Sequence, residues 1–169
     1  MASVCFYFQV HQPYRLRHYT IFDMASDYFD GFKNAEICRK VAQKCYLPTN
    51  RVLLELIERH GRQFKVSFSI TGTVLEQFAE YAPEVLASFQ YLAATGCVEF
   101  LAETYHHSLS FLFSPDEFAS EVAAHRQLIR DLFGQTPRVF RNTELIYNNQ
   151  VAEAVAKIGG FKAILAEGA

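Results

Sequence analysis

Residues 140–149 read Phe-Arg-Asn-Thr-Glu-Leu-Ile-Tyr-Asn-Asn, and this stretch decides the expected fold because it joins a strand end to a helix start. The apolar residues that lead into it indicate a short buried strand. The two asparagines at its end suit the N-cap of a helix that begins near Val151. Glu144 therefore follows a strand and precedes a helix. In a parallel α/β fold this is the edge of the sheet where ligands bind.

Two interpretations of Glu144 are open from this stretch alone. An ion pair with Arg141 is favoured locally, because ion pairs far outnumber catalytic acids. Catalysis is the alternative, since amide, hydroxyl and guanidinium groups surround a single acid. The choice depends on what the other strands place at the same edge.

Length and composition predict one domain over residues 1–169, because half of the residues are apolar and can bury one sizeable core. The formal net charge of -2 and the isoelectric point near 6.3 offer no long-range attraction to nucleic acid or to an anionic membrane. A neutral substrate is therefore expected. The composition does not indicate an oligomeric state.

The cysteines and the N-terminal residues bear on the cellular compartment. Four cysteines without Cys-x-x-Cys spacing are expected to be buried free thiols: Cys5, Cys38, Cys45 and Cys97. The first apolar run has no basic region before it, contains Gln9 and ends at His11, so we predict neither a signal peptide nor a membrane span. A cytoplasmic protein is expected.

Five short apolar runs predict strands, and helical periodicity predicts helices between them. The strands are expected at Val4 to Val10, Phe64 to Ile70, Val98 to Ala102, Val139 to Phe140, and Lys162 to Leu165. The helices are expected at 36–46, 49–61, 74–81, 83–95, 115–134 and 151–158, with Thr49 and Ser114 as N-caps and with Gly61, Gly96 and Gly134 at the ends. This order predicts an α/β fold with a mainly parallel sheet and right-handed crossovers, most simply part of a barrel.

Two features of the strands extend this prediction. The second strand alternates large apolar with small polar residues, which indicates a polar face such as a barrel interior. The fifth strand finishes near Ala169 with no helix to cover it, which leaves an open edge. We therefore expect a fragment, or a domain completed by other material.

Titratable residues accompany the predicted strands. The first strand stops at His11-Gln12-Pro13, so an imidazole and an amide stand at its C-terminal end. Glu99 lies within the third strand, where a buried carboxylate is costly without a partner, and Arg141 or His11 is the expected partner. His125 lies on the apolar face of its helix and is expected to be a satisfied core histidine rather than a ligand.

Three chemistries fit these strand ends to different degrees. A metal hydrolase or deacetylase would use histidines and an aspartate, but no aspartate directly follows a strand, and the adjacent His106 and His107 would usually point in different directions. A nucleotide site would need a glycine-rich turn after the first strand, and His-Gln-Pro is not one. A carboxylate-based glycoside hydrolase, which needs acids among amides, hydroxyls and aromatics, fits the inventory best.

Three motifs resemble the ordered regions of glycoside hydrolase family 57. They are His11-Gln12-Pro13 after the first strand, Gly96-Cys97-Val98-Glu99-Phe100 on the third, and Asn142-Thr143-Glu144-Leu145 on the fourth. The resemblance implies a (β/α)7 barrel, of which this chain would be about the first half with five strands. It also implies a retaining glycosidase or glucanotransferase of the α-amylase-like branch, acting on α-1,4-glucans or maltooligosaccharides without metal or cofactor.

The resemblance also assigns roles to individual residues. Glu144 aligns with the catalytic nucleophile, and His11 and Glu99 match residues that line the glucose-binding centre. The remaining candidates for substrate binding are Gln12 from the first motif, Tyr105 and His106, which follow the second motif, and Arg141. A cationic Arg141 near the strand ends would hold the carboxylates ionised, and a nucleophile needs that state. The ion-pair interpretation of Glu144 therefore loses its local advantage.

One departure from the family pattern concerns the general acid/base, an aspartate on a later strand that none of the aspartates in this chain matches. A retaining mechanism needs both carboxyl groups, so the 169-residue chain alone is predicted to be inactive. The alternatives are a metal-dependent carbohydrate deacetylase or mannosidase-like relative and a non-catalytic sugar-binding remnant. The sequence leaves open whether water or a sugar hydroxyl receives the glycosyl group.

Overall fold

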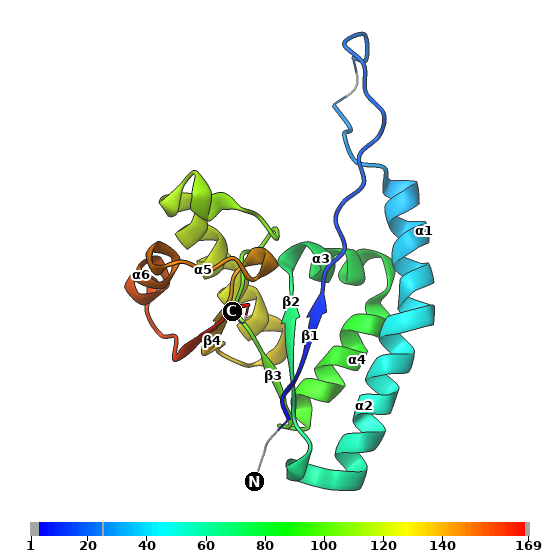
Figure 1. Ribbon diagram of the computed structural model, residues 1–169. Coiled ribbons are helices and arrows are strands. Elements are labelled where there is room, and N and C mark those ends of the chain that lie inside the picture. Colours follow the sequence, from blue (N-terminus) through cyan, green and yellow to red (C-terminus); the bar gives the residue numbers. More distant parts are fainter. Residues whose placement is uncertain (1–3, 25, 168–169) are drawn as a thin grey trace.

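A computed structural model describes residues 4–24 and 26–167, and within them five parallel strands follow one another in chain order (Figure 1). Strands β1 (Phe6–Val10), β2 (Val66–Ile70) and β3 (Val98–Phe100) form one sheet, and β4 (Val139–Arg141) and β5 (Ala163–Leu165) form another. A parallel bridge between Ala102 and Phe140 joins the two sheets, with Ala102 N–H donating to Val139 O at 2.9 Å. The predicted parallel α/β arrangement is confirmed.

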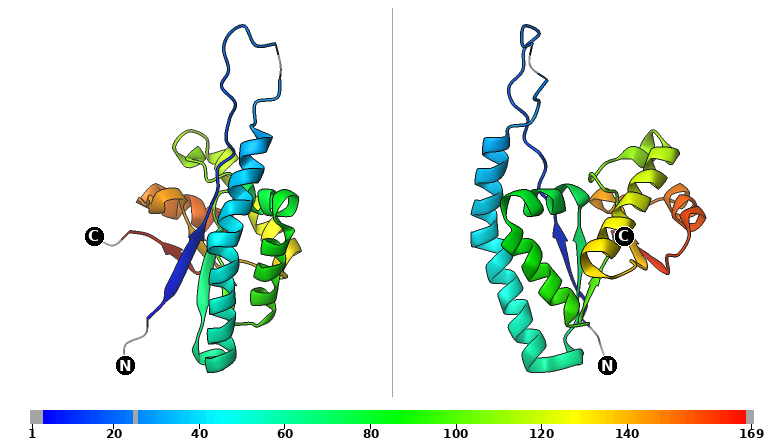
Figure 2. Two further views of the ribbon diagram at one scale, coloured as in Figure 1. Left: turned by 90° about the vertical axis from the view of Figure 1, so that its right-hand side faces the viewer. Right: turned by 180° about the vertical axis from the view of Figure 1, so that it is seen from behind.

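Helices connect the strands and lie outside them. They are α1 (Gly31–Val41), α2 (Leu47–His60), α3 (Gly72–Tyr81), α4 (Pro83–Ala94), α5 (Pro115–Phe133) and α6 (Asn149–Ile158), with a π-helical segment, η1 (Ala42–Tyr46), and short 3-10 turns at η2 (Gly61–Gln63), η3 (Ser110–Leu112) and η4 (Thr143–Leu145). In Figures 1 and 2, α1, α2 and α4 lie along strands β1 to β3 and α3 crosses near their C-terminal ends, whereas α5 and α6 lie beside β4. No helix in residues 4–24 and 26–167 is long and apolar enough to cross a membrane.

The helix ends agree with the sequence where local capping chemistry sets them. Ser114 accepts a hydrogen bond from Glu117 N–H at 3.3 Å, and Asn148 accepts one from Val151 N–H at 2.9 Å. Gly134 ends α5 with a left-handed φ of 67°. The N-cap predicted at Thr49 is wrong, because η1 carries the helical backbone from α1 into α2 and leaves no free helix start there.

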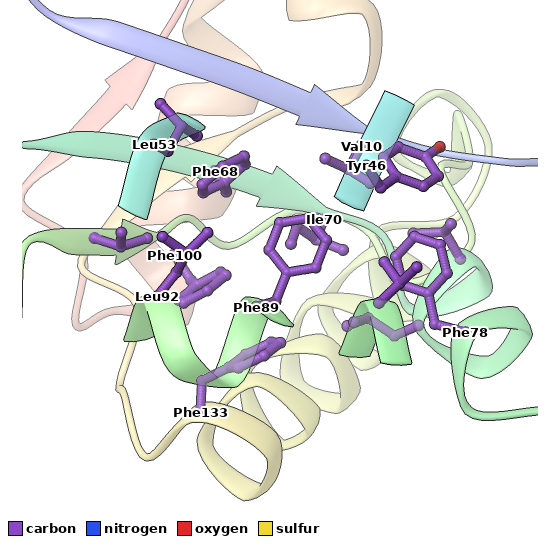
Figure 3. Close-up of a cluster of buried hydrophobic side chains, with 14 of the residues drawn as sticks. Val10, Tyr46, Leu53, Phe68, Ile70, Phe78, Phe89, Leu92, Phe100 and Phe133 are labelled. Atoms are coloured by element: carbon purple, nitrogen blue, oxygen red, sulfur yellow. The ribbon is translucent and has the colours of Figure 1, made fainter. Parts of the chain in front are cut away.

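The hydrophobic core fills the space between the strands and the helices (Figure 3). Phe68 of β2 packs edge-on against Phe89 of α4, with ring centroids 5.2 Å apart, and Phe100 of β3 stacks on Phe133 of α5 at 4.2 Å. A second cluster surrounds Phe140. The chain thus buries its large aromatics on the helix-covered side of the strands.

The opposite side of the strands is polar, as the alternation in β2 predicted. Tyr7, Ser67 and Glu99 lie side by side in register across β1, β2 and β3, and Gln9 pairs with Ser69 one pleat further along. Successive side chains of a strand point to opposite faces, so this row faces away from the aromatic core. Polar residues therefore line the side of the strand layer that faces away from the aromatic core.

Two burial predictions are wrong. Glu99 is exposed, since it faces a cavity of about 350 Å³ at the N-terminal ends of the strands rather than the core. Among the described residues it has neither an ion pair nor a hydrogen bond through its side chain, so the partner expected from Arg141 or His11 is not found. Cys5 and Cys45 are exposed, whereas Cys38 and Cys97 are buried free thiols.

Candidate active site

Four titratable side chains meet at the C-terminal ends of the strands. His11 follows β1, Glu103 and His107 follow β3, and Glu144 lies in η4 directly after β4. The parallel strands bring these loops to one edge, which is the usual ligand-binding edge of such folds. Of the residues predicted for the site, His11, Arg141 and Glu144 are brought together here.

His107 is the central side chain of this cluster. Its Nε2 lies 3.0 Å from Glu144 Oε1, and its Nδ1 lies 3.5 Å from Glu103 Oε2. The His11 ring stacks on the His107 ring with centroids 4.2 Å apart. One imidazole therefore bridges a buried carboxylate and an exposed one.

Glu103 is fully buried and makes contacts on several sides. The Ser69 hydroxyl donates to its Oε1, and Arg141 Nη1 lies 3.8 Å from its Oε2. Its backbone N–H donates to His125 Nδ1 at 3.4 Å. A buried carboxylate requires such partners, because an isolated one would be strongly destabilising.

Arg141 is only 2% exposed and directs its guanidinium toward the polar side of the strands. Its Nη2 donates to Gln9 Oε1 at 2.7 Å. The interpretation of Glu144 as the direct ion-pair partner of Arg141 is not supported, since Glu144 contacts His107 and the carboxylate nearest to Arg141 is Glu103.

The electrostatic environment favours an ionised Glu144. The hydrogen bond from His107 lowers the Glu144 pKa below its usual range, and the charges of His107 and Arg141 act in the same direction. The hydrogen bond to Glu103, together with the one to Glu144, raises the pKa of His107. Burial, followed by the neighbouring His107, lowers the pKa of His11 to about 4, so His11 is neutral near pH 7.

The backbone is strained at the two residues in contact. His107 and Glu144 have left-handed φ angles of 58° and 54°, and Leu145 follows with 57°. Within the described residues these are the only non-glycine positions with positive φ. Such conformations cost of the order of 1–3 kcal/mol each and cluster at functional sites.

The other predicted site residues lie outside this cluster. The Gln12 amide donates to the Tyr46 hydroxyl at 3.3 Å, and the Tyr105 hydroxyl donates to Glu76 at 2.8 Å. His106 is exposed and faces a separate hollow beside α5, and Glu99, the middle residue of β3, lines the cavity at the N-terminal ends of the strands. The structure thus places Gln12, Tyr105, His106 and Glu99 away from Glu144.

Sequence reasoning missed Glu103 and His107 as members of the cluster. Glu103 comes directly after the third predicted strand and His107 lies four residues further on, so their position near the carboxyl edge was a usable signal. No group of three or more His, Cys, Asp or Glu side chains in the described part of the chain is arranged to hold a metal ion.

Comparison with known proteins gives consistent similarities. A family model described as Glycosyl hydrolase family 57 matches residues 5–169. A Methanocaldococcus jannaschii protein named "Putative alpha-amylase" is 48% identical over 169 residues, which is 98% of this chain and 36% of that protein. The chain therefore spans about a third of this relative's length.

Two solved structures share the fold at low sequence identity. The 4-alpha-glucanotransferase from Thermococcus litoralis superposes with a TM-score of 0.73 at 16% identity, covering 96% of this chain and 22% of that one. The alpha-amylase AmyC from Thermotoga maritima gives a TM-score of 0.66 at 12% identity, covering 96% and 39%. Nearly the whole chain therefore follows the path of one part of these larger enzymes.

Proposed function

Because the chain belongs to glycosyl hydrolase family 57, we propose that it is the nucleophile-bearing part of a retaining enzyme that acts on α-1,4-glucans. The observation that carries the proposal is Glu144, an ionised carboxylate at the carboxyl edge of parallel strands. Its side chain is 68% exposed, so a sugar can reach it. The 48% identical relative supports the α-amylase-like assignment.

The proposed reaction proceeds in two displacements. A Glu144 oxygen attacks the anomeric carbon, and the bond to the leaving oxygen breaks as that oxygen takes a proton from a general acid. Water or a sugar hydroxyl then attacks the glycosyl ester from the opposite face, gives up its proton to the same group, and releases Glu144 as a carboxylate. Glu144 Oε1 is held by His107, and no described residue hydrogen-bonds Oε2, which leaves that oxygen available.

The general acid/base is proposed to come from an aspartate outside the described residues. Asp23 and Asp27 lie on the loop after β1, Asp30 caps α1, and Asp116 and Asp131 lie on α5, so none reaches Glu144. The five strands are accordingly proposed to be the first part of a (β/α)7 barrel. The N-terminal cavity beside Glu99 would then lie at the other end of that barrel.

Replacement of the nucleophile tests the proposal. In the whole encoded protein, Glu144→Gln is expected to lower kcat on maltoheptaose by about 10⁴-fold or more, because the amide cannot form the glycosyl ester. His60→Ala, on the exposed end of α2, is the control and should retain the wild-type rate. A Glu144→Gln protein with a near-wild-type rate would contradict the assignment.

Product and metal analysis separate the remaining alternatives. Retention predicts that NMR of the first product shows the α-anomer before mutarotation. Stoichiometric zinc together with activity that a chelator removes would instead indicate a metal-dependent carbohydrate deacetylase. Calorimetric binding of maltoheptaose without any turnover would indicate a sugar-binding remnant.

A further inference from the structure

We propose that Glu103 and His107 are positioning residues, which act through their contact to set the orientation and the charge of Glu144. The inference rests on the function proposed above and extends it to two residues that none of the three motifs contains. Glu103 is buried and cannot touch substrate, and His107 reaches Glu144 through a single nitrogen.

The first step of the argument is the geometry of the chain of contacts. Arg141 Nη1 lies 3.8 Å from Glu103, Glu103 lies 3.5 Å from His107 Nδ1, and His107 Nε2 lies 3.0 Å from Glu144. The buried end of this chain is fixed by Ser69 and His125, which bond Glu103. Glu144, at the exposed end, has His107 as its one described side-chain partner.

The second step concerns protons. Both ring nitrogens of His107 face carboxylate oxygens, and only an imidazolium carries two N–H donors. The charged groups around it are Glu103 and Glu144, which are negative, and Arg141, which is positive, so a positive His107 balances the set. The stacked His11 is neutral, and therefore does not repel it. Gln9 Nε2 lies farther from His107 Nε2, at 3.5 Å, so the contact to Glu144 is the shorter one.

The third step is the backbone. His107 has a left-handed φ of 58° and its Nε2 contacts Glu144, while its neighbour His106 faces the exposed surface. Non-glycine residues rarely adopt this conformation, and strain of this kind persists only where surrounding contacts fix it. His107 and Glu144 both have left-handed φ angles. A contact that positions the nucleophile would explain why the fold retains this strain at both residues.

The test uses a variant that preserves the backbone. His107→Asn retains a residue type that tolerates left-handed φ but cannot carry the charge. In the whole encoded protein we expect kcat on maltoheptaose to fall about 10²-fold, as for a misplaced reacting group, with a much smaller change in KM. The acidic limb of the pH profile of kcat/KM should move to higher pH, because Glu144 loses the cation that lowers its pKa.

A second variant and a matched control complete the experiment. Glu103→Gln should shift the acidic limb in the same direction by less, because it weakens the proton affinity of His107 without removing the ring. His60→Ala should leave both the rate and the limb unchanged, and urea unfolding checks that each variant folds. One outcome would overturn the positioning role and leave the proposed function intact. In that outcome Glu144→Gln is inactive, while His107→Asn keeps the wild-type kcat and the wild-type acidic limb. A Glu144→Gln protein that keeps its activity would instead overturn the function.

Discussion

At the scale of single residues, His125 links the carboxyl edge of the strands to the core. It is fully buried in α5, its Nε2 donates to Ile70 O at 2.7 Å, and its Nδ1 accepts from Glu103 N–H. His125→Leu keeps most of the volume but leaves both backbone groups without a partner. We expect a loss of about 2–4 kcal/mol in the free energy of unfolding, measured with urea at pH 7.

The same variant has a pH signature. Burial lowers the pKa of His125 in the folded state below its ordinary value of 6.5, so the unfolded chain binds a proton more readily. The contribution of His125 is therefore complete above pH 6.5 and declines as the pH falls below it. The stability difference between wild type and His125→Leu should shrink from pH 7 to pH 5. A difference that grows on acidification would contradict a neutral, buried His125.

Residue identities predicted part of the site, and backbone conformation explains the remainder. Glu144 and Arg141 could be found because one acid and one arginine stand at a predicted strand end. His107 could not be separated from His106 by periodicity, since both lie in a turn, and His107 has a left-handed φ that no sequence pattern reveals. Glu99 was misassigned because this middle residue of the short strand β3 points to the exposed face, where it lines the cavity at the N-terminal ends of the strands.

At the scale of helices and strands, Gly72 shows how α3 is fitted against the loop that carries His107. A Cβ at Gly72, the first residue of α3, would come within 2.6 Å of the Tyr105 ring. Thr73 N–H also donates to Tyr105 O at 3.3 Å, so a displaced ring would move the segment next to His107. We expect Gly72→Ala to cost about 1–3 kcal/mol in the free energy of unfolding and to lower kcat in the whole protein.

Gly31 provides a matched control for this prediction, because it is also the first residue of a helix. A Cβ at Gly31 would meet nothing within 4 Å. Gly31→Ala should therefore leave stability unchanged or slightly raised. Equal destabilisation by the two alanine variants would show that helix-start conformation, rather than contact with Tyr105, determines the cost.

Helix ends that depend on a nearby capping residue were predictable from the sequence, whereas helix boundaries that depend on long-range packing were not. Ser114 and Asn148 cap helices through their own side chains, and Gly134 ends one through its φ, so short sequence windows sufficed. The π-helical segment η1 merges two predicted helices because buried Ala42 and Tyr46 pack into the core, which no local pattern reveals.

At the scale of the whole molecule, the described helices lie on the apolar side of the strand layer, opposite its polar side. All described helices lie outside the strands, as Figures 1 and 2 show, while Gln9, Ser69 and Arg141 line the other side. The order of five parallel strands followed from the alternation of strand and helix signals. The pairing of the outer edges of β1 and β5 was not predictable, because the sequence pattern of a strand does not specify its partner.

Activity of the 169-residue chain itself provides the last prediction. We expect the purified chain to unfold cooperatively in urea yet to release no product from maltoheptaose. Retaining hydrolysis needs a second carboxyl group about 5–5.5 Å from the nucleophile. The other carboxylate that contacts His107 is Glu103, which is buried and lies near Arg141. The whole encoded protein is the positive control, and the chain carrying Glu144→Gln sets the background. Turnover by the chain that disappears in its Glu144→Gln variant would show that a proton donor lies within these residues, and the leading candidate would then be Glu103 acting through His107.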